Sequence, residues 1–259
     1  MSRFASHVAR LLAGFALAAA ATVPDAAAQI RRDRTWIAVN AGIQAASGGI
    51  DDRFQFERHV ETATVSVDYG NEPAVAFEGG GGYRFWRNVG AGVVLSRSTR
   101  NGEAEIDAGI PHPFFDNRHR AVTGTDGASR TETGVHVQLT YTIASRTRAL
   151  LVTLSGGPSH LRVEQELVTD VLYAESFPFD EAAFTGAVTA RSSASATGFH
   201  AGVDIAWMTG RRRQVGVGGM VRFSRASMDL ETPASAADRR TIAATAGGLH
   251  AGAGLRLQF

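Results

Sequence analysis

The closing residues of the chain, Gly247 to Phe259, alternate strictly between two kinds of residue. One set is apolar: Leu249, Ala251, Ala253, Leu255, Leu257 and Phe259. The other set is polar or lacks a side chain: His250, Gly252, Gly254, Arg256 and Gln258. A period of two is typical of a β-strand with one apolar and one polar face. The same alternation recurs along most of the chain, so the sequence predicts an all-β fold.

Residues 1–28 predict an export signal that is not part of the fold. They begin with basic residues, continue with an apolar run from Leu11 to Val23, and end on the small residues Ala26–Ala28. The apolar run is too short to cross a bilayer comfortably as a helix. We therefore expect a mature chain of residues 29–259, organised as one β-barrel domain.

The mature chain has no second apolar run of the roughly 18 residues that a membrane helix requires. Strands can cross a membrane only as a closed barrel, because every backbone polar group must be paired inside the bilayer. The chain has no cysteine, which excludes a disulfide framework. Its net charge of +1 does not indicate that it binds nucleic acid.

Eight alternating segments can be marked, and the connections between them alternate between long and short. The segments are Trp36–Ala45, Ala74–Trp86, Val89–Arg100, Thr131–Ile143, Ala149–Val163, Ser195–Met208, Gln214–Arg225 and a closing segment after Ala243. Short periplasmic turns and long extracellular loops are typical of outer-membrane barrels. The pattern predicts an antiparallel up-and-down transmembrane β-barrel of eight strands. A soluble sandwich or lipocalin-like barrel is the alternative, but it has no reason to alternate its loop lengths.

A further stretch, Phe54 to Tyr69, also alternates and leaves ten strands as a possibility. Its many charged residues favour a hairpin that protrudes beyond the membrane. Aromatic residues lie near the segment ends, where an interfacial girdle is expected. They are Trp36, Tyr83, Phe85, Trp86, Tyr141, Trp207, Phe223 and Phe259.

On these segments and the terminal Gly-Leu-Arg-Leu-Gln-Phe, the chain resembles the small eight-stranded outer-membrane barrels of Gram-negative bacteria, the OmpA/OmpX-like superfamily. The resemblance covers most of residues 29–259. It implies a location in the bacterial outer membrane. It also implies that Leu255, Leu257 and Phe259 belong to the signal read by the barrel assembly machinery.

The polar phase of the segments predicts an inward-facing network. Its members are Glu78, Arg84, His136, Gln138, His200, Asp204, Arg222, His250 and Arg256. An eight-stranded barrel is just wide enough to be filled by side chains, and buried charges must pair. The expected arrangement is a salt-bridged, filled interior. A proton-relay or catalytic cluster of His136, His200 and His250 is the alternative.

Signals for other chemistry are weak, and we predict no enzymatic activity, cofactor or metal. Gly79–Gly82 lies inside a strand and lacks the Lys-Ser/Thr of a phosphate loop. His112, Asp116 and His119 are metal-ligand types but lack further ligands. The resemblance includes lipid A-modifying enzymes, whose family motif places a serine two residues after a histidine, followed by asparagine. His250 is followed by Ala-Gly, so this motif fails.

The long connections are rich in acidic residues, whereas the short turns carry arginines and no acid. We therefore expect a structural or surface-interaction barrel whose acidic extracellular loops form the binding surface, because function concentrates in loops held by a rigid scaffold. A narrow channel for small or hydrophobic solutes and a lipid A-modifying enzyme are the alternatives. The expected partners are outer-membrane lipid, lipopolysaccharide and the assembly machinery, with no nucleic acid, and the protein is expected to be a monomer.

Overall fold

The computed structural model describes residues 34–46, 48–145, 149–210, 212–232 and 239–259. The predicted export signal lies outside these residues. No helix in the described residues is long and apolar enough to span a lipid bilayer.

The described residues form one antiparallel sheet of ten strands. The strands are β1 (Thr35–Ala46), β2 (Ile50–Arg58), β3 (Glu61–Tyr69), β4 (Ala74–Trp86), β5 (Val89–Pro111), β6 (His119–Ala144), β7 (Leu150–Glu175), β8 (Ala182–Thr209), β9 (Val215–Glu231) and β10 (Thr241–Gln258).

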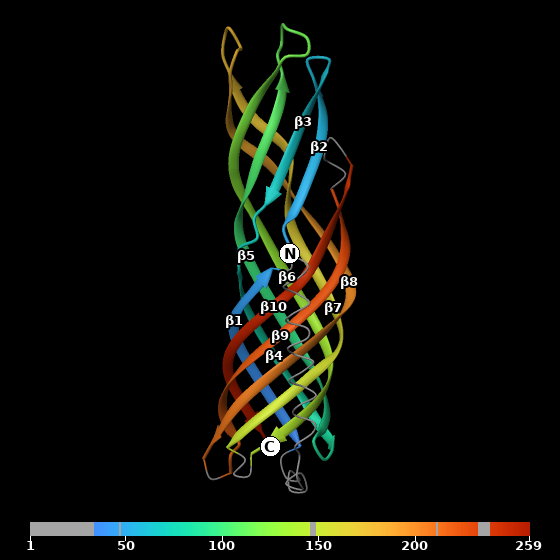
Figure 1. The fold of residues 1–259 in the computed structure, drawn as a ribbon, viewed down its shortest axis with the longest axis vertical. Helices are drawn as coiled ribbons and strands as arrows, with labels where there is room; N and C mark the ends of the chain where they lie inside the picture. The colour runs from blue at the N-terminus through green and yellow to red at the C-terminus, as the bar shows by residue number, and fades with distance from the viewer. Residues whose placement is uncertain (1–33, 47, 146–148, 211, 233–238) are drawn as a thin grey trace, which may run out of the picture.

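Eight of the ten strands close a barrel. Their order is β5-β4-β1-β10-β9-β8-β7-β6, and the pairing of β6 with β5 completes the circle. The first strand therefore pairs with the last, and the backbones of Thr35 and Phe259 exchange hydrogen bonds of 2.9 and 3.0 Å at this closure. The remaining strands, β2 and β3, form a hairpin that pairs with the far half of β5 (Figure 1). The predicted eight-stranded barrel and its protruding hairpin are both confirmed.

The strands are staggered around the barrel. Following the paired positions from Val89 through each strand in turn leads back to Thr99 on the same strand, ten residues further along. A stagger of this kind requires the strands to tilt against the barrel axis. Two residues at the same height along the barrel axis are therefore not paired directly. From each strand to the next they are offset from the paired position by a little more than one residue.

The connections that were predicted to be long loops are mostly strand, which corrects the sequence analysis. Strand β5 continues to Pro111 instead of ending near Arg100, and β6 begins at His119 instead of Thr131. Strands β7 to β10 are extended in the same way. The wall therefore rises far beyond the membrane segments, and its hairpin tips lie at the end opposite the short turns (Figure 1). We call this upper part the extension.

The polarity of both faces of the wall inverts along single strands. On β5, odd-numbered residues face outward and even-numbered residues face inward throughout. The outward side chains change from apolar Val93 and Leu95 to acidic Glu105, and the inward side chains change from polar Ser98 to apolar Ile106. An apolar outer surface is stable when hydrocarbon surrounds it, and a polar outer surface is stable in water. The change marks the extracellular boundary of the membrane.

The extension is packed like a water-soluble protein. Its interior is a cluster of buried apolar side chains contributed by β2, β3 and the far halves of β5 to β10. The largest fully buried members include Tyr69, Ile106, Ile110, Leu167 and Leu230. The Tyr69 hydroxyl accepts a 2.7 Å hydrogen bond from the backbone N–H of Val168. Burial raises the pKa of Tyr69, so this phenol stays neutral within the core.

Arg240 joins the β2–β3 hairpin to the rest of the extension. Its Nε donates a 2.7 Å hydrogen bond to Oδ1 of Asp52, and its Nη2 donates a 2.8 Å bond to the carbonyl of Val168. The guanidinium also lies 4.2 Å from the ring centroid of Phe54. One side chain therefore links β2, β7 and the start of β10. This link replaces a strand pairing, because β2 pairs only with β3 among the described strands.

The aromatic residues form a girdle, with two corrections. Phe223 lies on β9 away from the short turns, where its ring is 6.1 Å from that of Phe199. Tyr83, Phe85, Trp86, Tyr141, Trp207 and Phe259 are exposed around the end that carries the short turns. Trp36, which was predicted to join them, instead turns into the barrel. A Cβ atom built on Gly82 would lie 2.8 Å from its ring, and one on Gly92 would lie 2.7 Å from it. These glycines are required because the indole occupies the space that a side chain would need.

Candidate functional site

The nine residues of the predicted network all face the barrel interior. Eight are buried and Asp204 is half-buried. They do not form one cluster, however. The structure arranges them at several heights with further residues that the sequence analysis did not single out. These are Asn40, Gln44, Ser96, Ser159, Arg130 and Glu132.

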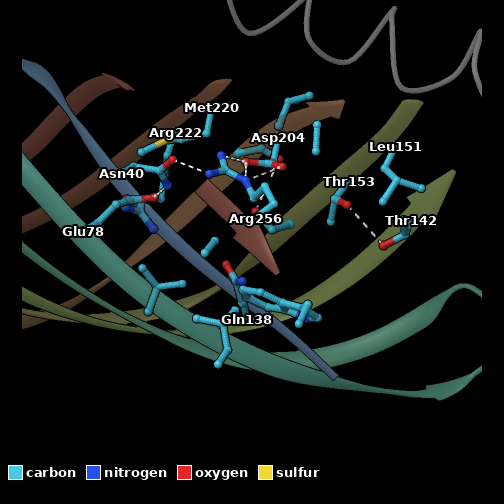
Figure 2. A pocket seen from close by; sticks show the side chains of 18 of the residues that line it. Asn40, Glu78, Gln138, Thr142, Leu151, Thr153, Asp204, Met220, Arg222 and Arg256 are labelled. Atoms are coloured by element: carbon cyan, nitrogen blue, oxygen red, sulfur yellow. Dashed lines mark hydrogen bonds and ion pairs between the residues drawn. The ribbon is translucent and has the colours of Figure 1, made fainter. Parts of the chain in front are cut away.

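Arg256 is the centre of the lower layer. Its guanidinium donates to both carboxylate oxygens of Asp204, with Nε at 2.9 and 3.1 Å, and Nη1 donates a 2.6 Å bond to Oδ1 of Asn40. The amide of Asn40 in turn donates a 2.7 Å bond to Oε1 of Glu78 (Figure 2). Asn40 thus transmits the interaction from one ion pair to the next, across β8, β10, β1 and β4.

Glu78 is the only carboxylate in contact with Arg222 among the described residues. The Oε2 atom of Glu78 contacts Nη2 of Arg222 and lies 3.4 Å from Nδ1 of His250. Both charged side chains are only 7% exposed. A charge buried to this degree costs several kcal/mol unless it is paired, so each partner depends on the other.

Two of the interior histidines share a serine, beside the level of Glu78. His136 contacts Ser96 Oγ through Nε2 and Ser159 Oγ through Nδ1, both at 2.8 Å. Ser159 Oγ also lies 2.8 Å from Nδ1 of His200, and the two imidazole rings are 5.1 Å apart. The third histidine, His250, faces Glu78 instead. Two of the three histidines of the proposed relay are therefore joined through a serine, and the third contacts a carboxylate and not that serine.

The uppermost polar layer is organised by Glu132. Its carboxylate accepts bonds from Arg130 Nε at 2.8 Å, Gln44 Nε2 at 2.9 Å and the backbone N–H of Gly247 at 2.9 Å. Gly247 has a positive φ of 96°, which a residue with a side chain rarely adopts. This irregularity in β10 turns the N–H inward to the carboxylate.

The lower interior contains a pocket that extends from the ion pairs of Arg256 and Arg222 towards the short turns. Arg84 and Gln138 belong to its lining, together with Trp36, Thr142 and Thr153. The hydroxyls of the two threonines lie 3.2 Å apart (Figure 2). A small apolar cluster of Leu151, Ala206 and Met208, with Ala144 against it, lies towards the short turns.

The arrangement offers little for catalysis. Ser159 stands between two imidazoles but is only 1% exposed inside the wall, so a substrate has no access to it. No three His, Asp or Glu side chains of the described residues come together as a metal site. Of the loop residues considered for metal, His112 is buried against Phe115, and His119 contacts the backbone of Thr62.

The tips of the extension are tied to one another. The backbone N–H of Asn117, in the β5–β6 turn, donates to Glu61 of β3 at 2.8 Å. Arg118 forms a 2.9 Å ion pair with Asp180 in the β7–β8 turn. Arg120, buried at the base of these turns, pairs with Glu175. These contacts hold three hairpin ends together at the point farthest from the membrane.

Exposed phenylalanines cluster on the joined tips. Phe114 packs edge-on against Phe179 at 5.5 Å, and Phe177 against Phe179 at 6.2 Å. Phe114 is nevertheless 68% exposed, Phe177 is 84% exposed, and Phe115 is also exposed. Rigid apolar side chains that face water are typical of interaction surfaces.

Much of the predicted acidic surface lies on strand faces, although Asp180 and Glu181 remain in the β7–β8 turn. Asp51, Asp68 and Glu105 stand opposite one another on β2, β3 and β5, and all three are exposed. Like charges in directly opposed positions repel one another and are not placed there for stability.

No protein-family model matches the chain, and no curated protein matches it. Among solved structures, it is similar to the outer membrane protein OprG from Pseudomonas aeruginosa, with 11% identity, 87% of this chain and 96% of that chain covered, and a TM-score of 0.47. It is similar to Neisserial surface protein A, with 10% identity, 88% and 96% covered, and a TM-score of 0.43. It is also similar to the outer membrane protease OmpT from Escherichia coli, with 8% identity, 88% and 98% covered, and a TM-score of 0.40. At these identities the likeness concerns the fold alone.

The geometry of the chain itself defines its class. The wall closes without a free edge in the membrane, its outer belt is apolar and its interior is polar and ion-paired. The protein is a transmembrane β-barrel of the bacterial outer membrane. More particularly, it is a small eight-stranded barrel whose wall continues into a folded extension.

Proposed function

We propose that this barrel is a surface-interaction protein, in which the membrane part serves as an anchor and the extension carries the binding surface. The working surface consists of the phenylalanine tips and the acidic face of β2, β3 and β5. A partner with an apolar patch and a cationic rim fits this combination.

The observation that carries the proposal is the construction of the extension. Long strands with their own apolar core hold the tips in one place, at a distance from the membrane. Ion pairs and backbone hydrogen bonds join the tips to one another. A rigid surface loses little conformational freedom when it binds, which favours affinity.

The tips should make cells adhere to an apolar surface. We expect cells that display the wild-type protein to be retained on octyl-coated beads, and cells that display the triple variant Phe114→Ser, Phe115→Ser and Phe177→Ser to be retained several-fold less, because the exposed apolar area is removed. The fraction of retained cells is counted after washing.

The matched control is Val60→Ser, which removes an exposed apolar residue from the β2–β3 tip outside the phenylalanine cluster. It should leave most of the retention intact. Surface levels of all variants are compared by antibody labelling of an epitope tag. Equal retention of the wild type and the triple variant at equal display would show that the tips are not the working surface.

The interior pocket favours a narrow channel as the second candidate. The pocket is lined by polar groups such as Arg84 and Gln138. The apolar cluster around Leu151 and Met208 lies between it and the short turns, and the apolar core of the extension lies on its other side. These two clusters should block the passage of ions. We expect the refolded protein to carry no steady current across a planar lipid bilayer at 1 M KCl. A lasting single-channel conductance would support the channel and contradict the closed interior.

The closing strand supports a role in assembly as well. Leu255, Leu257 and Phe259 face outward and are exposed at the end of β10. We infer that they are recognised by the barrel assembly machinery, because an apolar strand edge remains open until β1 pairs with β10. A lipid A-modifying activity finds no support in the described residues, since Ser96 and Ser159, the serines that contact His136, both face the filled barrel interior.

A further inference from the structure

The outer wall carries a row of basic and hydroxyl side chains at the extracellular rim of the apolar belt. Arg97, Thr133 and Arg162 stand opposite one another on the adjacent strands β5, β6 and β7. All three side chains face outward and are exposed. We propose that they form a binding site for a phosphate group of an anionic lipid in the outer leaflet. This site is separate from the tips and independent of the function proposed above.

The height of the row matches the lipid headgroups. One step closer to the membrane, the paired positions are Leu95 and Val135, both exposed on the apolar belt, and His160 on β7, where the polar outer face begins one step lower. One step farther from it, Thr99 and Thr131 continue the polar outer face. The row therefore lies where the hydrocarbon ends, and this is where the phosphates of membrane lipids are found.

The spacing of the row suits a single phosphate. Adjacent strands lie about 4.8 Å apart, so the backbones of Arg97 and Arg162 are about 10 Å apart with Thr133 between them. Two arginine side chains of this separation can converge on one group, and arginine binds phosphate with two parallel hydrogen bonds. The stagger of the strands also brings His160, beside Arg162, level with Arg97, where it can supply a further donor.

The charges around the row leave the arginines available. Arg97 has no ion-pair partner within the part of the chain that the structure describes. Arg162 lies 3.2 Å from Glu164, but both side chains are well exposed, and a pair of this kind contributes little. The outward neighbours at the two ends of the row, Phe77 and Ser195, carry no negative charge. A doubly charged phosphate can therefore displace the glutamate.

The experiment titrates the refolded protein, in neutral detergent micelles, with bisphosphorylated lipid A and measures the dissociation constant by microscale thermophoresis. The double variant Arg97→Gln and Arg162→Gln should bind at least about tenfold more weakly, because two charge-assisted contacts are lost. Raising the salt concentration should weaken binding to the wild type more than binding to the double variant.

The matched control is Arg191→Gln. Arg191 is also an exposed arginine that lies near a glutamate, Glu166 at 3.5 Å, but it is located higher on the extension. It should change the affinity by no more than about twofold, since it is far from the headgroup level. Equal affinities for the double variant and this control would refute the site. Heat-dependent gel migration confirms that each variant is folded before the titration.

Two further ligands identify the source of the phosphate. Lipid A from which both phosphates have been removed should bind no better to the wild type than to the double variant. Inorganic phosphate at millimolar concentration should not displace lipid A, because it lacks the acyl chains that pack on the belt. Tight binding of the phosphate-free lipid, or displacement by inorganic phosphate, would overturn the assignment to a lipid.

Discussion

Replacing Glu78 with leucine is expected to lower the free energy of unfolding by about 3–5 kcal/mol, the largest effect that we foresee for a single change in this chain. The carboxylate is the partner of Arg222, and both side chains are 7% exposed. It also accepts the 2.7 Å bond from Asn40 that connects this pair to Arg256. Without Glu78, the guanidinium of Arg222 remains buried with no opposite charge beside it.

The measurement is a urea titration of the protein in lipid vesicles, followed by tryptophan fluorescence and by the migration of unheated samples on a gel. Two controls separate the buried charge from other effects. The double variant Glu78→Leu and Arg222→Met removes both charges and should recover much of the loss, because a buried ion pair replaced by apolar groups is often neutral.

The second control is Asp180→Asn at the tips, where the ion pair with Arg118 is 51% exposed on each side. It should cost no more than about 1 kcal/mol. If Glu78→Leu lowers the free energy of unfolding as little as this control does, the interior is hydrated, and water solvates the guanidinium of Arg222 in place of the carboxylate.

An arginine in place of Leu139 is expected to reduce the stability of the inserted barrel by about 2–4 kcal/mol. Leu139 lies in the middle of the outward apolar set of β6 and is 64% exposed to what surrounds the barrel. If that surrounding is hydrocarbon, a guanidinium there loses its hydration without gaining a partner. If it were water, the same change would be almost neutral.

The matched variant is Thr123→Arg on the same strand. Thr123 also faces outward and is exposed, but it lies in the extension. We expect a change of no more than about 0.5 kcal/mol for this variant, since its surroundings are water. The two variants are compared by the same urea titration. Similar losses at both positions would contradict the membrane boundary that the polarity inversion defines.

The sequence predicted the membrane part well, for a local reason. The apolar set of each segment recurs with period two against lipid, so the outward face can be read without knowing any neighbour. This is true of Val135 to Ile143 on β6 and of the closing residues on β10. The hairpin of β2 and β3 was recognised because its charges do not fit a bilayer.

The extension was read as loops because two opposite alternations meet on one strand. On β5 the apolar residues, apart from the buried Val94, are odd-numbered up to Leu95, whereas Ala104, Ile106, Ala108 and Ile110 are even-numbered. A change of phase of this kind looks like the end of a strand when the sequence is read alone. In the structure the strand never changes its phase, and only the solvent on each side changes.

The layers of the interior also required the tertiary structure. Every predicted member faces inward, but parity alone does not say which side chains meet. The stagger of ten residues determines that Glu78 meets Arg222, that Arg256 meets Asp204, and that His136 and His200 share Ser159 while His250 does not. Ser159 and Asn40, which connect these groups, occupy inward-facing positions of the two-residue alternation. Their position in this alternation is the only feature of the sequence that could have indicated their role.

The sequence by itself determined which way most membrane residues point, because the solvent on each face of a strand acts on every second residue without reference to the rest of the chain. Only the tertiary structure decided how far the strands continue and which buried groups pair. Both depend on the register between strands that are distant in sequence, and on where hydrocarbon gives way to water along a closed wall.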